Sequence, residues 1–354
     1  MIHRKGENTI NFLTILLALL VFGVLIFVHE LGHFLVARAC GVTIREFAVG
    51  MGPKLFSVRS KKYETQYSLR LFPIGGFVSM EGEDEDSEDE NAFNHKNVWQ
   101  KIAIIVAGPL MNILLAILVM FVLVAGFGTP ISTTVGAFVE GATSDDCGLA
   151  LDDTVVKVNK IPVFTGNELV YEIMHQGDRP IDLTVIRNGE KTVIRDVVFP
   201  GFSESGVTFG EADFKLYAAP KTFGNIVKHG FFRSLSTVKM IWDSLIDMLT
   251  GRYGMESVSG PVGITQEIGK AAQAGFSTLL YMCVVISMNL GIFNLLPIPA
   301  LDGGRLLFRL IEALRGGRPL KPEWENYIHM VGILLLLALM LFISFKDVLK
   351  IILK

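Results

Sequence analysis

Two histidines and a glutamate, His29, Glu30 and His33, have the spacing of a metal site that acts on water. Side chains four residues apart lie one above the other on the same face of a helix. His29 and His33 would therefore offer two imidazole nitrogens to one metal ion, and Glu30 would lie beside them to act on a water molecule at that ion. The pattern predicts a metal centre with an acid–base group next to it.

This pentad lies inside an apolar stretch. Residues 10–28 include no charged side chain, and the apolar character resumes at Phe34. Such a run is long enough to cross a bilayer as a helix. A chance match to a short motif is the alternative, but three ionisable side chains inside a bilayer are costly unless they face a protein interior and have a function there. The surroundings therefore favour the metal site.

The composition is that of a membrane protein. Hydrophobic residues make up 51% of the 354 residues and the mean hydropathy is +0.47, which favours several spans separated by soluble parts, in two or three domains. The formal net charge of −3 argues against a nucleic-acid binder, which would need a basic face. Three scattered cysteines suit neither a disulfide framework nor a thiolate metal site, and we interpret them as small apolar fillers.

The apolar residues gather in four candidate membrane spans, at about 10–37, 102–125, 277–296 and 331–352. The first run is too long for a signal peptide, and the pentad stands where a cleavage site would be, so we expect a retained span. Lys and Arg are abundant in the loops between spans one and two and between spans three and four, which lie on one side by parity. That side should be the cytoplasm. Both termini would then be extracytoplasmic. The positive charges of Arg4, Lys5 and the C-terminal lysines argue weakly against this orientation.

Asp302 is the candidate for a third metal ligand, because catalytic zinc sites usually have three protein ligands and a water. It follows span three, which runs in the same direction as span one, so Asp302 and the pentad should both lie near the cytoplasmic face. Pro297 and Pro299 break the helix and let irregular backbone carry Asp302 inward. A plain turn at this Asp-Gly-Gly sequence is the alternative. Asn112, in span two, is equally compatible with interhelical packing and with a role at the site.

The soluble parts show β-type patterns. Residues 45–80 predict a hairpin or small sheet next to the pentad, and residues 81–90 predict an acidic, solvated loop. Residues 130–205 predict a β-rich domain whose Gly148–Asn159 stretch resembles the PDZ pattern, so an extended peptide would bind as an added strand. A spacer without a ligand is the alternative. Residues 223–249 predict an amphipathic helix on the membrane surface or packed on the spans.

Together these motifs resemble the bacterial site-2 proteases, the intramembrane zinc metalloproteases of the regulator-of-sigma-E-protease type, in a form with a single PDZ domain. The resemblance rests on His29-Glu30-Leu31-Gly32-His33, Gly108-Pro109-Leu110-Met111-Asn112, the PDZ-like insert, Ser259-Gly260-Pro261-Val262-Gly263 and the stretch from Asn294 to Gly303. It covers nearly the whole chain.

We therefore expect an α-helical polytopic membrane protein with about four transmembrane helices, a membrane-associated β-hairpin or sheet and an inserted β-rich PDZ-like domain. The expected parts are 1–129 with the pentad, the strand region and span two, 130–205 as the PDZ-like domain, 206–275 with the amphipathic helix and a connector, and 276–354 with the Asp302 motif and the last span. The protein would lie in the bacterial inner or cell membrane, with its active site near the cytoplasmic face and its PDZ-like domain outside.

The resemblance also implies roles for the site residues. His29, His33 and Asp302 would bind Zn²⁺, and Glu30 would be the catalytic base. Asn294 would contact the substrate backbone, and the strand region would present an edge to it. We place that edge at Tyr67, Ser68, Leu69, Arg70 and Leu71. The implied substrates are single-span membrane proteins, such as anti-sigma factors already trimmed outside, or remnant signal peptides.

Two other classes of function fit the sequence less well. A metal transporter would need further polar groups along the spans, where Asn112, Asn289 and Asn294 are the candidates, and it has no use for a glutamate inside the pentad. A PDZ scaffold with an inactive membrane anchor would be expected to have lost the pentad, which is intact here.

Overall fold

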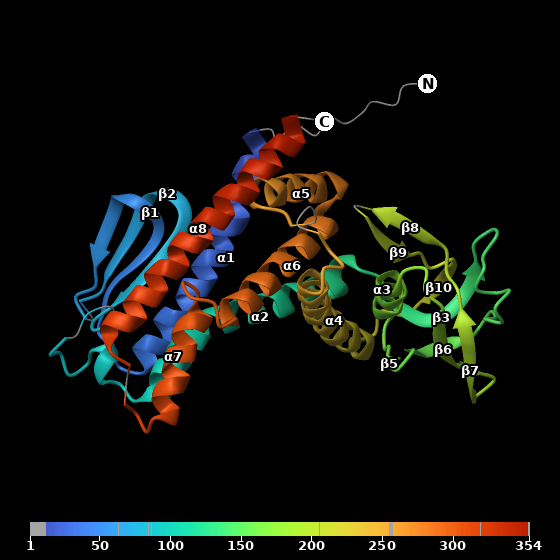
Figure 1. Cartoon of the computed structure of the whole chain (residues 1–354), viewed down its shortest axis with the longest axis horizontal. Coiled ribbons are helices and arrows are strands. Elements are labelled where there is room, and N and C mark those ends of the chain that lie inside the picture. The colour runs from blue at the N-terminus through green and yellow to red at the C-terminus, as the bar shows by residue number, and fades with distance from the viewer. Residues whose placement is uncertain are drawn as a thin grey trace. The chain divides into compact units, whose positions relative to one another are not determined.

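The structure is a computed structural model that describes residues 12–62, 64–83, 85, 87–204, 206–254, 258–318 and 320–352. Some expectations fall outside these residues: the first two residues of span one, Tyr63, Asp84 and Asp86 in the strand and acidic stretches, and Arg4, Lys5 and Lys354 in the orientation argument. The chain folds as two compact units (Figure 1). Unit 1 comprises the chain up to Ala116 and from Ser259 onward, and unit 2 comprises Ile117–Val258.

Four long apolar helices dominate the chain, and they confirm the four predicted spans. They are α1 (Phe12–Ala39), α2 (Val98–Val122) with its π-helical continuation η2 (Leu123–Phe127), α6 (Phe276–Leu295) and α8 (Pro322–Ile352). Among the described residues, these are the four helices long and apolar enough to cross a bilayer. At most 28% of the apolar window of each is buried within the protein, so most of their surface is apolar and faces outward, as lipid contact requires.

Glycines allow the spans to approach closely. A Cβ atom on Gly32 of α1 would lie 2.3 Å from the carbonyl oxygen of Ala107 on α2, and one on Gly291 of α6 would lie 2.8 Å from that of Pro109. Such contacts are available only where one helix has no side chain. Helix α2 therefore packs tightly against both α1 and α6.

The motif around Gly260 is explained by a carboxylate on the last span. Helix α5 (Pro261–Ala274) begins there, and buried Asp347 of α8 accepts hydrogen bonds from the backbone N–H groups of Gly260, at 2.8 Å, and Gly263, at 2.9 Å. The carboxylate accepts hydrogen bonds from N–H groups that have no partner within the helix, and its negative charge interacts favourably with the positive end of the helix dipole. This contact anchors one end of α8 to α5.

The predicted strand region forms a two-stranded sheet whose strands are long and folded back on themselves (Figure 1). The strands are β1 (Ile44–Arg59) and β2 (Gln66–Met80), followed by a 3₁₀ turn η1 (Phe93–His95). Phe47 lies opposite both Tyr67 and Val78, and Tyr67 also lies opposite Val58. The first half of β2 is thus interior, and its second half is at an edge. The sheet exposes large apolar side chains, among them Leu55, Phe56, Val58, Leu71 and Phe72.

Unit 2 contains an antiparallel β-sheet domain with helices. Its elements are β3 (Ile131–Phe138), β4 (Thr154–Val158), β5 (Ile161–Pro162), α3 (Gly166–Gln176), β6 (Ile181–Arg187), β7 (Glu190–Val197), β8 (Gly201–Glu204), β9 (Val207–Gly210), β10 (Phe214–Ala218) and α4 (Phe223–Leu249). The main sheet has the order β10-β3-β4-β6-β7, β5 pairs with β4, and β8 pairs with β9. This sheet continues beyond residue 205 to β10.

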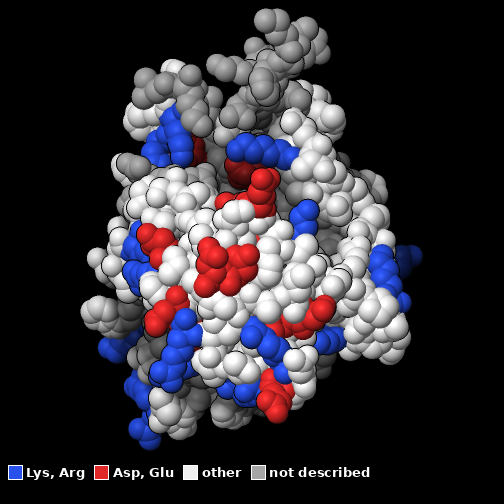
Figure 2. All heavy atoms as spheres, turned by 90° about the vertical axis from the view of Figure 1, so that its right-hand side faces the viewer, with Lys and Arg blue, Asp and Glu red and all other residues white. Residues whose placement is uncertain are grey.

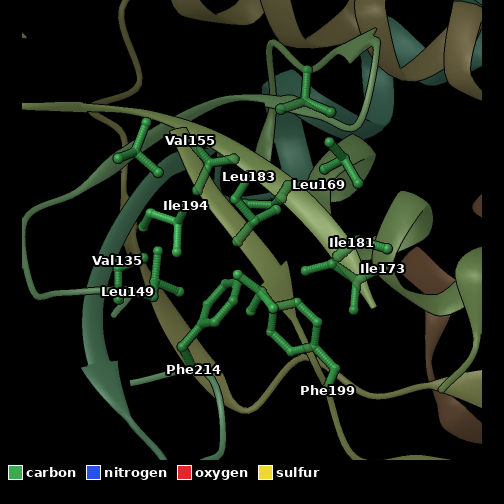
Figure 3. Packing of buried hydrophobic residues seen from close by; sticks show 14 residues of the cluster. Val135, Leu149, Val155, Leu169, Ile173, Ile181, Leu183, Ile194, Phe199 and Phe214 are labelled. Carbon is green, nitrogen blue, oxygen red and sulfur yellow. The ribbon is translucent and has the colours of Figure 1, made fainter. Parts of the chain in front are cut away.

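The core of unit 2 lies between this sheet and α3. Side chains from the strands and the helix point toward one another (Figure 3), and Val155, Leu183, Leu169 and Ile173 are fully buried. Each such side chain contributes about 1.5–3 kcal/mol on burial. Helix α3 begins at a capping box in which Thr165 and Glu168 satisfy the free N–H groups of its first turn.

Helix α4 packs on α3. Phe232 of α4 stacks on Phe164, with 4.2 Å between ring centroids, and Lys239 bridges buried Glu172 at 2.8 Å and Asp243 at 2.6 Å. The opposite side of α4 exposes an apolar stripe that includes Phe223, Val227, Phe231, Leu235, Trp242, Ile246 and Leu249. The end face of the molecule at the right of Figure 1 has acidic and basic side chains interspersed (Figure 2), as is typical of a solvated surface.

Candidate metal centre

Unit 1 brings His29, His33 and Asp302 together. The Nε2 atom of His29 lies 3.0 Å from Asp302 Oδ2, the Nε2 atom of His33 lies 3.5 Å from it, and the two Nε2 atoms are 3.2 Å apart. Among the described residues, this is the group of three His, Cys, Asp or Glu side chains whose ligand atoms all lie within 4.8 Å of one another. The two histidines come from α1, and Asp302 is the first residue of α7 (Asp302–Leu314).

The donor set of this cluster fits a zinc ion. Asp302 Oδ2 is buried and has no hydrogen-bond partner, although both Nε2 atoms face it. A buried acceptor left without a partner costs about 1–3 kcal/mol, so such an arrangement is expected where an ion completes the site. Two imidazole nitrogens and one carboxylate oxygen are a common ligand set of catalytic zinc, with a fourth position open.

The ring of His33 is oriented by a backbone carbonyl of α2. Its Nδ1 atom lies 2.8 Å from the carbonyl oxygen of Ile104. Because a carbonyl can only accept a hydrogen bond, Nδ1 must carry the proton, and the lone pair is then on Nε2. The hydrogen bond therefore fixes the tautomer that a metal ligand needs.

Asn112 performs the corresponding role for His29. Its Nδ2 atom lies 3.3 Å from His29 Nδ1, while its Oδ1 atom is buried without a partner. Turning the amide by half a turn places Oδ1 against Nδ1–H and satisfies both groups. The main-chain carbonyl of Asn112 accepts a hydrogen bond from Ser287 of α6 at 2.8 Å. Of the two interpretations that the sequence left open, the structure places Asn112 at the site.

Gly108 of α2 lies against His33, although sequence analysis named it only as part of the Gly108–Asn112 stretch and gave it no role at the site. A Cβ atom at this position would lie 2.2 Å from His33 Nε2, the ligand atom itself. Only glycine leaves room for the imidazole there. The available signal was the Gly-Pro pair inside an otherwise regular apolar helix.

Glu30 lies against the second half of β2. A Cβ atom on Gly76 would lie 3.2 Å from Glu30 Cγ, and the backbone N–H of Val78 donates a hydrogen bond to the Glu30 carboxylate. The strand therefore runs directly beside the pentad.

The structure corrects the position of the open strand edge. Tyr67, Ser68 and Leu69 have paired residues on both sides: Ser68, for example, lies opposite both Ala48 and Ser57. The expectation that Tyr67–Leu71 supplies the open edge is wrong for these three residues. The Ser68 and Arg70 side chains are bonded instead to Glu46. The edge next to Glu30 is instead formed by residues 76–80, which pair with β1 on one side. The sequence did not reveal this, because both strands fold back on themselves and the alternation of side chains does not show which half lies outside.

Asn294 lies in the last turn of α6 and is half-buried. The helix ends at Leu295, and the segment up to Leu301 leads to Asp302, as Pro297 and Pro299 predict. A Cβ atom on Gly303 would lie 1.9 Å from the carbonyl oxygen of Leu296, so this turn requires glycine. A contact of Asn294 with substrate stays a prediction.

Comparisons with known proteins agree with this geometry. The model of peptidase family M50 matches residues 17–339. The chain is 37% identical over 346 residues to a protein of Clostridium acetobutylicum whose name provisionally describes a zinc metalloprotease, covering 96% of this chain and 98% of that protein. It is 30% identical to the regulator of sigma-W protease RasP of Bacillus subtilis, covering 95% of this chain and 98% of RasP, and 31% identical to the zinc metalloprotease RasP of Geobacillus kaustophilus, covering 97% and 98%.

Proposed function

The chain belongs to peptidase family M50, the site-2 protease family, and is a zinc metalloprotease; from this premise we propose that it hydrolyses peptide bonds within or near the transmembrane segments of single-span membrane proteins. The observation that carries the proposal is the convergence of Asp302 with His29 and His33, two residues of a helix that is apolar enough to cross the bilayer. A hydrolytic site at that depth suits a bond that lies in a membrane.

In this proposal His29, His33 and Asp302 hold the zinc ion. The ion supplies a Lewis acid for the scissile carbonyl and lowers the pKa of water at the site. Glu30 takes a proton from the attacking water and delivers it to the leaving amine. The Ile104 carbonyl and the Asn112 amide hold the imidazoles in the required tautomer and orientation.

We propose that the substrate binds along residues 76–80. A peptide bond inside a helix has its backbone groups occupied by helical hydrogen bonds, so the substrate must unwind before attack. Residues 76–80 pair with β1 on one side, and on the other side their backbone groups other than the Val78 N–H, which donates to Glu30, would offer replacement hydrogen bonds. The unwound backbone would then lie next to the base. Asn294, at the broken end of α6, is the proposed second contact with the substrate backbone.

The names of the relatives support a substrate class. The Bacillus subtilis protein is named as a regulator of sigma-W protease, which supports anti-sigma factors as substrates, with remnant signal peptides as a second source of single spans. The expected orientation, with the active site near the cytoplasmic face and unit 2 outside, rests on the Lys and Arg distribution. We also propose that the exposed apolar faces of the β1–β2 sheet and of α4 bind the bilayer.

Unit 2 is proposed to be a PDZ-like filter. Its strand β10 ends the order of the main sheet and pairs on one side with β3, so its other side is available for an added strand. A domain that binds or obstructs the outer part of a substrate would restrict access without taking part in hydrolysis.

Purified enzyme mixed with a single-span substrate tests the proposed function. Mass spectrometry of the products should locate the cut within the span or within a few residues of it, and zinc removal should abolish the cut. Cleavage confined to soluble segments of the substrate would contradict the proposal.

A further inference from the structure

The segment that presents Asp302 contains a residue in an unusual backbone conformation. Ala300 has φ +78°, in the left-handed region that side chains with a Cβ atom rarely adopt. It lies two residues before Asp302, between α6 and α7. The next residue, Leu301, is the N-cap of α7 and makes no side-chain capping hydrogen bond. The turn is closed by its own hydrogen bond, from the backbone N–H of Leu301 to the carbonyl oxygen of Ile298 at 3.2 Å, and contacts from other elements add to it.

One such contact is a histidine on the last span. The backbone N–H of Ala300 donates a hydrogen bond to Nδ1 of His329, at 3.2 Å. His329 is on α8 and lines a cavity of about 150 Å³ together with Arg305 and Arg309 of α7. It is not part of the metal cluster and was not singled out by its sequence context.

The same face of α8 is fixed on both sides of His329. Glu325, one turn earlier, forms an ion pair with Arg309 of α7. Gly332, one turn later, lies so close to the turn that a Cβ atom there would be 2.5 Å from Pro299 Cβ. Positions 325, 329 and 332 repeat at helical spacing, so they lie on one face. Helix α8 therefore supports His329 against the Asp302 turn.

We propose that His329 is a positioning residue: by accepting the Ala300 N–H it holds the turn in its left-handed form and so holds Asp302 against His29 and His33. The inference rests on the proposed function, in which Asp302 is a zinc ligand. Without the acceptor, the turn keeps the Leu301–Ile298 hydrogen bond but loses the one at Ala300 itself. Ala300 should then leave the left-handed region more often, so that Asp302 is held less firmly against the imidazoles. Residues that orient a ligand in this way alter metal affinity by about 10- to 100-fold.

The test uses the full-length enzyme in detergent and three variants. His329→Phe keeps a ring but removes the acceptor, whereas His329→Asn places an oxygen on Cγ where Nδ1 was. Ala300→Gly combined with His329→Phe lets the left-handed conformation form without support, since glycine adopts it freely. Asn326→Ala, which changes another residue lining the same cavity, is the matched control.

Zinc affinity, measured by competition with a chelator, should fall about 10- to 100-fold in His329→Phe. It should stay near wild type in His329→Asn and Asn326→Ala and recover in the double variant. The loss of turnover should appear in kcat while KM is kept. Unchanged zinc affinity in His329→Phe would overturn the inference, and so would failure of Ala300→Gly to rescue it. Asp302→Ala separates the two levels: if it keeps full zinc affinity, the proposed ligand set fails as well.

Discussion

Two buried carboxylates, one in each unit, have opposite surroundings. In unit 2, Asp213 is buried and its carboxylate accepts hydrogen bonds from the N–H groups of Thr143, at 2.8 Å, and Ser144, at 3.0 Å, and from the Ser144 hydroxyl at 2.6 Å. In unit 1, Asp302 is mostly buried with Oδ2 unpartnered and two imidazoles facing it. A buried carboxylate whose oxygens have hydrogen-bond partners stabilises a fold, whereas converging polar atoms that lack such partners can form a binding site.

A second pair of residues sharpens this comparison. Asp153 of unit 2 is fully buried; burial raises the pKa of its carboxyl, but the hydrogen bonds and charge of Arg187 outweigh burial and hold that pKa below its usual range. Its oxygens also accept the N–H of Ala150 at 2.9 Å. Glu30 of unit 1 is next in sequence to His29 and accepts a hydrogen bond from the backbone N–H of Val78. The first carboxylate should affect stability alone, and the second should affect catalysis alone.

The largest expected effect belongs to Glu30→Gln. The variant keeps the three ligands and loses the base, so zinc content should stay at one per chain while turnover falls by about 10²- to 10⁴-fold. Zinc analysis and cleavage of a single-span substrate measure both quantities on one sample. Near-normal turnover would remove Glu30 from the mechanism.

Gly108→Ala tests how tightly the site is built. Its new Cβ atom would lie 2.2 Å from His33 Nε2, so the imidazole must move and zinc affinity should fall by about 10- to 100-fold. Gly126→Ala is the matched control, because a Cβ there meets no atom within 4 Å. Equal zinc affinity in both variants would show that the helices open easily around His33.

Asp153→Asn tests the saturated carboxylate of unit 2. It weakens the bonds to Arg187 and should lower the stability of unit 2 by about 1–3 kcal/mol while zinc affinity is unchanged. Because the pKa of Asp153 is lowered in the folded protein, its contribution is complete above the unfolded pKa of about 3.9 and is lost as pH falls through the folded value. Calorimetry of the full chain should show the difference at pH 6 and its disappearance in strong acid. A difference that persists there would contradict this electrostatic account.

The smallest expected effect concerns the strand edge at residues 76–80. Methylating one backbone nitrogen of the substrate beside the cut removes one main-chain hydrogen bond, worth about 1 kcal/mol, and should raise KM about fivefold. A side-chain change at the same substrate position is the control and should have less effect. If N-methylation at every position around the cut leaves KM unchanged, substrate is not held as an added strand.

The sequence predicts what depends on local pattern. The four spans follow from long apolar runs, and the pairing of His29 with His33 follows from helical spacing. The position of Asp302 near the pentad was predicted from the common direction of spans one and three and from the prolines that follow α6. The sequence does not reveal the parts played by Gly108, Asn112 and His329. They depend on which helix faces pack against one another, and a local sequence pattern does not specify that. The strand edge was misplaced for the same reason, because the sequence of β2 does not reveal which of its halves lies at the edge of the folded sheet.

X-ray absorption at the zinc edge tests the central claim most directly. The wild-type enzyme should show zinc with two imidazole nitrogens and light-atom oxygen ligands at about 2.0–2.2 Å, and Asp302→Asn should change the oxygen shell while both imidazoles remain. A sulfur ligand, or a spectrum that Asp302→Asn leaves unchanged, would contradict a zinc site built from His29, His33 and Asp302.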